Sequence, residues 1–152
     1  APGGGPPPAP PPGGGRAPSF ATAFLLACEA GDFSRFRTAP EFASWCGLTP
    51  SEHSSGETLS RGGITRAGNA HVRSALVEAA WHVPMSSREA KPLASDQEVA
   101  PAVRRHAAKC NRRLQDRREA MSAAGKKPVV ANCATAREMA CWVWAIARMA
   151  VA

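Results

Sequence analysis

Most of the residues that interrupt helices and sheets are gathered at one end of the chain. Residues 1–18 hold eight of its 14 prolines and six of its 13 glycines. Proline-rich runs stay extended, glycine-rich runs stay flexible, and neither supplies apolar side chains to bury. We therefore expect a disordered tail or linker over residues 1–18 and one folded domain over residues 19–152. A domain of that size buries roughly two-thirds of the surface of its unfolded chain, which suffices for a single core.

The remaining sequence has apolar residues at helical spacing and no stretch that alternates convincingly at period two, so we predict an all-α or mainly α domain. Cap residues, prolines and glycines set most of the predicted helix ends. Residues 48–68 are rich in Gly, Ser and Thr, which predicts a loop or a short irregular hairpin. The predicted helices run from Ser19 to Gly31, from the N-cap Thr38 to Gly47, from the N-cap Asn69 to Pro84, from Pro101 to Gly125, and over about Ala134–Ala150.

The cysteines and the apolar runs indicate where in the cell the protein works and whether it binds metal or spans a membrane. The five cysteines are odd in number and none form a C-x-x-C pair, so we expect reduced thiols in the cytoplasm rather than a disulfide scaffold. A zinc site built from Cys46, His53, His71 and His82 would have no ligand pair at zinc-motif spacing, so no metal is predicted. The longest apolar run, Met139–Ala147, is far shorter than the roughly 20 residues that span a bilayer. The chain opens with neither Met nor a readable export signal, and we expect a processed or partial product.

The positive charge lies in one segment. The whole chain has a formal net charge of +7, and residues 101–127 carry nine basic side chains against Asp116 and Glu119. Six of the nine avoid the apolar seam of the predicted helix and would form a basic face: Arg105, Lys109, Arg112, Arg113, Lys126 and Lys127. Such a face favours nucleic-acid phosphates. The alternative is an ordinary solvated helix surface with pairs such as Arg112–Asp116.

A basic, glycine-rich turn precedes the third predicted helix. Gly62, Gly63 and Gly68 would allow a ligand to approach the backbone, while Arg61 and Arg66 supply positive charge. The free amides of a helix start, here after the predicted N-cap, also attract anions. These features together are typical of a phosphate-binding loop, although a glycine-rich turn alone is weak evidence.

The order of residues over Cys46–Val83 is more specific. The runs G-L-T-P-S-E-H-S-S-G, G-G-I-T-R-A-G-N-A-H-V-R and A-L-V-E-A-A-W follow one another there. This order resembles the C-terminal domain of the DEDD insertion-sequence transposases, recombinases that have a resolvase-like nuclease half and work with a bridge RNA. Further similar motifs extend the resemblance over about Ala21–Ile146: Gly31–Phe36 upstream, and Asn111–Leu114, Gly125–Pro128 and Ala136–Glu138 downstream.

The resemblance implies roles for individual residues. Ser55, or alternatively Ser54, would be the nucleophile toward a DNA phosphate, and the neighbouring His53 is a candidate base. DNA, a structured guide RNA and, for the full-length protein, further copies of itself would be the partners. Three residues of the basic motif would contact the DNA or RNA backbone or brace the loop: Arg66, Asn69 and Arg73.

The sequence also departs from that family. The nuclease-like half, whose four acidic residues hold Mg²⁺, is not in this sequence, so we expect Mg²⁺ only together with that half and no cutting or joining of DNA by this chain alone. One alternative is a non-catalytic basic helical module that binds nucleic acid, left behind by a decayed element. Another is self-association through Trp142, Trp144 and Met149, although aromatic residues at helical spacing more often belong to a core.

Overall fold

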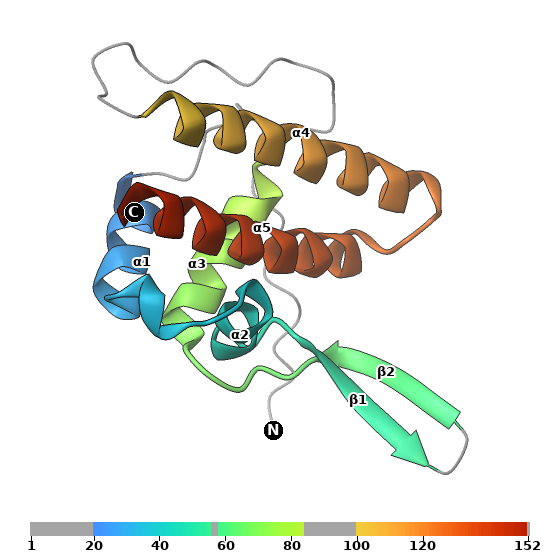
Figure 1. Ribbon diagram of the computed structural model, residues 1–152. Coiled ribbons are helices and arrows are strands. Elements are labelled where there is room, and N and C mark those ends of the chain that lie inside the picture. Colours follow the sequence, from blue (N-terminus) through green and yellow to red (C-terminus); the bar gives the residue numbers. More distant parts are fainter. Residues whose placement is uncertain (1–19, 56–57, 84–99, 152) are drawn as a thin grey trace.

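The computed structural model describes residues 20–55, 58–83 and 100–151 (Figure 1). The predicted tail over residues 1–18 and most of the predicted connection after the third helix lie outside the described residues. The domain is mainly α, as predicted, with one small antiparallel sheet. Its elements are α1 (Phe20–Ala30), the short 3-10 helix η1 (Phe33–Arg35), α2 (Ala39–Trp45), β1 (Pro50–Ser55), β2 (Thr58–Ile64), α3 (Ala70–Trp81), α4 (Pro101–Ala123) and α5 (Pro128–Val151).

The predicted helix starts of α2 and α3 rest on side-chain caps. Thr38 Oγ1 accepts a hydrogen bond from the Glu41 amide at 3.3 Å, and the Glu41 carboxylate reaches back to the Arg37 amide at 2.7 Å. At α3, Asn69 Oδ1 accepts from the Val72 amide at 3.0 Å. Each bond satisfies an amide that has no partner within its helix, which is why Ser, Thr, Asn and Asp mark helix starts.

The prediction for the last helix is wrong at its start, because α5 begins at Pro128 rather than near Ala134. Proline has no amide hydrogen and suits the first helical turn. Val129 and Val130, which follow it, are about half exposed and do not belong to the buried stripe. Because these exposed valines do not follow the helical spacing of the buried apolar residues, that spacing predicted the start of α5 too far along the chain.

Helix α5 organises the core. It packs against α2, α3 and α4, and crosses the middle of the domain in Figure 1. Phe42 of α2 and Leu76 of α3 are essentially inaccessible to solvent beneath it. Trp142 and Trp144 also pack against this core, and Trp144 Nε1 donates to the Phe36 carbonyl at 3.0 Å. The two tryptophans thus have a packing role within the domain.

The buried side of α4 includes a charged residue, which the spacing of the apolar residues in the sequence does not reveal. Cys110 and Leu114 are buried, and Arg118, one turn further, is also buried and only 8% exposed. Its guanidinium lies over the Trp81 ring and donates hydrogen bonds to the Ala80 carbonyl at the end of α3 and to Asn132 of α5. Arg118 therefore joins three helices and does not contribute to the exposed basic face.

Residues 48–68, for which the sequence predicted a loop or a short irregular hairpin, contain a hairpin. Strands β1 and β2 pair from Pro50 with Ile64 to Ser55 with Thr58, with a bulge between Pro50 and Glu52. The hairpin extends away from the helices (Figure 1), and its base is tied by a hydrogen bond from the Thr65 amide to the Thr49 carbonyl at 3.0 Å. A two-stranded hairpin alone is marginally stable in water, so this hydrogen bond helps to hold the hairpin against the rest of the domain. No described helix is both long and apolar enough to cross a membrane.

Candidate nucleic-acid interface

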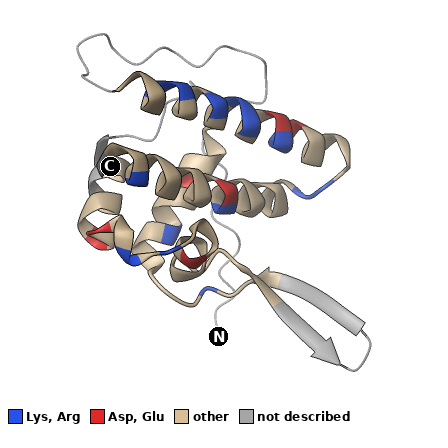
Figure 2. Ribbon diagram, viewed as in Figure 1, with Lys and Arg blue, Asp and Glu red and all other residues tan. Residues whose placement is uncertain are grey.

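Lys and Arg residues recur along α4 and in the turn before α5, and acidic residues lie near the end of the helix (Figure 2). All six residues of the predicted basic face are exposed: Arg105, Lys109, Arg112, Arg113, Lys126 and Lys127. The predicted alternative, a pair between Arg112 and Asp116, does not form. The Glu138 carboxylate of α5 accepts a hydrogen bond from Arg113 Nε at 3.0 Å and forms an ion pair with Arg117 Nε, also at 3.0 Å.

The remaining basic side chains on this surface stand outside these ion pairs. Within the part of the chain that the structure describes, no ion-pair partner faces the other five residues of the basic face. We call these five residues the basic row: Arg105, Lys109, Arg112, Lys126 and Lys127. Exposed cations of this kind attract a phosphate backbone and release its counterions on binding.

The glycine-rich turn is packed tightly against α2. Gly68 has φ +99°, and a Cβ there would lie 2.0 Å from the Trp45 carbonyl oxygen. The conformation of Gly68 therefore serves a close approach within the chain, and the approach of a ligand to its exposed backbone stays a prediction. Gly63 differs, since it is exposed and a Cβ there would meet nothing within 4 Å.

Asn69 and Arg73 hold this turn in place. Besides capping α3, Asn69 donates to Glu29 at 2.8 Å, and Glu29 also lies 3.3 Å from His71 Nδ1. The Asn69 hydrogen bond, followed by that of His71, lowers the pKa of Glu29. Arg73 Nη1 donates to the Arg66 carbonyl at 3.0 Å. Both residues thus brace the loop, and their contact with nucleic acid stays a prediction.

The candidate nucleophile lies at the end of the hairpin away from the helices. Ser54 pairs with Leu59 and Ser55 with Thr58, the last described rung of the ladder. Further along β2, Arg61 pairs with Glu52. The structure describes the backbone of these strands, so the predicted roles of Ser55, Ser54, His53 and Arg61 stay predictions. Among the described residues, no three His, Cys, Asp or Glu side chains are grouped so as to hold a metal ion.

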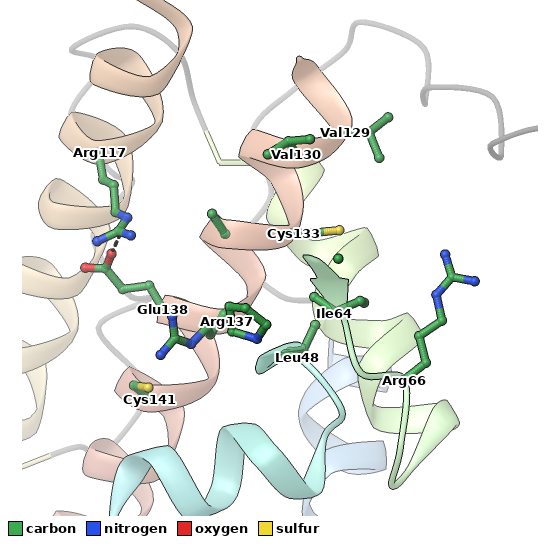
Figure 3. Close-up of a pocket in the computed structure, with 13 residues that line it drawn as sticks. Leu48, Ile64, Arg66, Arg117, Val129, Val130, Cys133, Arg137, Glu138 and Cys141 are labelled. Carbon is green, nitrogen blue, oxygen red and sulfur yellow. Dashed lines mark ion pairs between the residues drawn. The ribbon is translucent and has the colours of Figure 1, made fainter. Parts of the chain in front are cut away.

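A cleft of about 510 Å³ lies between α5, the base of the hairpin and α4 (Figure 3). We call it the valine cleft, after the exposed Val129 and Val130. Of its lining residues, the sequence had singled out Gly63 and Arg66 in the glycine-rich turn, and Arg137 and Glu138 through a family motif without a role. For the apolar part of the cleft, the only hint in the sequence was the pair of valines, Val129 and Val130, directly after Pro128. The lining residues are Leu48, Pro50, Gly63, Ile64, Arg66, Arg117, Val129, Val130, Cys133, Ala134, Arg137, Glu138 and Cys141.

Comparison with known proteins shows to which family this chain is similar. A family described as "Transposase IS116/IS110/IS902 family" matches residues 18–94, which include the hairpin and α3. The protein y4qE of Sinorhizobium fredii, named as a transposase, is 43% identical over 136 residues, covering 89% of this chain and 35% of y4qE. A protein of Pseudomonas aeruginosa named as a family 20 transposase is 39% identical over 59 residues, covering 39% of this chain and 18% of that protein.

The chain therefore spans about a third of the length of y4qE and less of the Pseudomonas protein. No solved structure matches it. The family match covers half of the chain and contains the three runs within Cys46–Val83 on which the resemblance was based, whereas the similar motifs after residue 100 lie outside it. This chain belongs to the IS116/IS110/IS902 family of transposases.

Proposed function

We propose that this chain is the C-terminal, nucleic-acid-binding part of an insertion-sequence transposase. It binds DNA along the basic row and presents Ser55 at the end of the hairpin as the nucleophile. The observation that carries the proposal is the basic row itself, five exposed cations without ion-pair partners among the described residues. Membership of a transposase family makes DNA the expected polyanion. A structured guide RNA and self-association of the full-length protein are further expectations from the family.

The spacing of the basic row suits a phosphate backbone. Arg105, Lys109 and Arg112 follow one another at i, i+4 and i+7, which places them along one side of α4 over about 10 Å. A DNA duplex carries about six phosphate charges over that length. Asp116 and Glu119 follow at the same spacing, and Lys126 and Lys127 carry positive charge again in the turn after the helix. Contacts of this kind position a duplex without reading its sequence.

The chemistry proposed for Ser55 is the formation of a bond between its oxygen and a DNA phosphorus, with departure of the adjoining sugar oxygen. The serine hydroxyl must lose its proton to a base, and His53 is the residue proposed for that task. Charge on the attacking and leaving oxygens must also be offset. The described residues contain no acidic cluster for Mg²⁺, so no metal-dependent step is assigned to them.

The test uses a full-length transposase that contains this segment, together with its element end, guide RNA and Mg²⁺. The predicted result is a covalent protein–DNA adduct that Ser55→Ala abolishes, while Ser54→Ala retains it and both variants bind the DNA like the parent. An adduct that forms normally in Ser55→Ala would show that another residue is the nucleophile. Normal binding together with unaffected recombination in both variants would favour the non-catalytic module.

A further inference from the structure

Apolar surface remains uncovered at the start of α5. Val129 is 49% exposed and Val130 54% exposed, and they are the large apolar side chains that stand most open among the described residues. The buried side of this helix start is formed instead by Ala131 and Asn132, so the two valines are not needed to close the core. They form one wall of the valine cleft (Figure 3). Exposed apolar surface inside a concave site is typical of a place that a ligand covers.

The charges around this wall are positive. Arg66 and Arg137 line the cleft and have no ion-pair partner in the described part of the chain. The single carboxylate of the cleft, Glu138, is already held by Arg113 and Arg117. An anionic ligand would therefore meet two free guanidinium groups and a neutralised carboxylate.

The backbone holds Arg66 at the rim of the cleft in an unusual conformation. Arg66 has φ +55°, the left-handed region that non-glycine residues seldom adopt. Its amide donates to the Gly47 carbonyl at 3.1 Å, and its own carbonyl accepts from Arg73 at 3.0 Å. Such a conformation persists only where surrounding bonds enforce it, and it occurs often at ligand sites. Here it leaves the Arg66 side chain exposed.

An apolar wall beside free guanidinium groups matches the chemistry of a nucleotide. An unpaired base can stack on apolar side chains and on guanidinium planes, while its phosphate accepts hydrogen bonds from arginine. A base within a duplex cannot do so, because both of its faces are already stacked. The volume of about 510 Å³ lies within the range of small-ligand sites. The cleft also adjoins the basic row, since Lys127 is separated from Val129 by Pro128 alone.

We infer that the valine cleft binds one unpaired nucleotide of a strand whose backbone follows the basic row. Its base packs against Val129 and Val130, and its phosphate lies between Arg66 and Arg137. This inference rests on the proposed nucleic-acid binding and adds the strand state that the domain recognises. The favoured substrate is a duplex with an unpaired extension rather than a blunt duplex.

The experiment compares two DNA probes of the same duplex sequence, one blunt and one with a short unpaired extension. Dissociation constants are measured by fluorescence anisotropy for the 152-residue chain and for Val129→Asn/Val130→Asn. This double variant keeps the charge unchanged, and Ala27→Asn, at an exposed position of α1, is the matched control. The parent and the control are expected to prefer the extended probe by about fivefold. The double variant loses this preference and binds the blunt probe unchanged, and Arg137→Gln weakens binding of the extended probe more than of the blunt one.

The cysteines of the chain supply an independent readout. Cys133 lines the cleft and is partly exposed, whereas Cys28 is exposed on α1 outside it. The extended probe is expected to slow maleimide labelling of Cys133 and to leave Cys28 unaffected, with peptide mass spectrometry as the measurement. This readout does not depend on whether a variant folds.

The outcomes separate the two proposals. Equal affinity for both probes, with Cys133 labelled at the same rate in each complex, would overturn the nucleotide site and leave duplex binding by the basic row intact. Absence of binding to either probe would overturn the proposed function, and the nucleotide site with it. Protection of Cys133 by an acidic peptide but by neither DNA probe would identify the cleft as a protein-binding site instead.

Discussion

The guanidinium of Arg73 on α3 donates a hydrogen bond to the backbone carbonyl of Arg66 at 3.0 Å. One arginine thus holds the backbone of another, and the second one lines the valine cleft. The same Nη1 atom lies 3.5 Å from the Cys46 carbonyl at the end of α2. Through this pair, α3 fixes the turn that links the hairpin to the helical body.

Arg73→Ala is expected to destabilise the domain by about 1.5 kcal/mol, because its charged side chain donates to two backbone carbonyls, of which that of Cys46 is partly buried. Arg73→Lys keeps the charge but not the planar donor geometry, so it should restore only part of the stability. Urea unfolding followed by circular dichroism measures both. Equal stability of Arg73→Ala and the parent would show that Arg73 does not brace the turn.

Gly68→Ala is expected to destabilise the domain by more than about 2 kcal/mol, since the new Cβ adds a backbone clash to the strain of a positive φ. Gly125→Ala is the matched control. Gly125 has φ +75° but open space where its Cβ would lie, so this change should cost only about 1 kcal/mol. Thermal unfolding of the two variants decides the point, and a smaller effect at Gly68 than at Gly125 would contradict the packing described.

Arg118→Met removes a buried guanidinium while roughly keeping the volume of the side chain. It removes the hydrogen bond to the Ala80 carbonyl, which keeps that of the Val83 amide, and it leaves Asn132 Oδ1 without its donor. We expect a loss of about 2–3 kcal/mol. The exposed Arg112→Met on the same helix should change stability by less than about 0.5 kcal/mol. Similar unfolding midpoints for the two variants would mean that Arg118 does not join α3, α4 and α5.

Glu29 provides a pH dependence. Its pKa lies below the ordinary value of 4.5, because Asn69 and then His71 donate to its carboxylate. A lowered pKa in the folded state contributes stability at higher pH, and this contribution disappears as the pH falls below about 4.5 through the folded pKa. Glu29→Gln should therefore be less stable than the parent near neutral pH, and the difference should shrink on acidification.

Stability curves of the parent and Glu29→Gln against pH measure this effect, with Glu78→Gln at an exposed position of α3 as the control. A difference between parent and Glu29→Gln that stays constant from neutral to acid pH would show that the Glu29 carboxylate is not stabilised by its neighbours.

Local signals in the sequence predicted the helices well where caps set their ends. Thr38, Asn69, Pro101 and Gly125 each mark an observed end, because they satisfy or terminate backbone hydrogen bonding regardless of the tertiary fold. The start of α5 was predicted wrongly because Val129 and Val130 are exposed and do not follow the spacing of the buried apolar residues.

Features that depend on distant partners could not be predicted. The burial of Arg118 depends on Ala80 and Asn132, which are far from it in sequence, and the role of Gly68 depends on Trp45. The basic face was predictable, since charge spacing on a helix directly specifies which side chains share a side. The valine cleft was not, because it exists only where α5 meets the hairpin.

The salt dependence of DNA binding tests most directly whether α4 is the interface. Arg105→Gln/Lys109→Gln/Arg112→Gln is compared with the parent and with Arg37→Gln, a change at an exposed arginine before α2. The logarithm of the association constant should fall with the logarithm of salt concentration, and the triple variant should lose a slope of about 0.9 per lost phosphate contact, close to three in total. Arg37→Gln should keep the parent's slope. A triple variant with the same slope and affinity as the parent would contradict the assignment of α4 as the nucleic-acid interface.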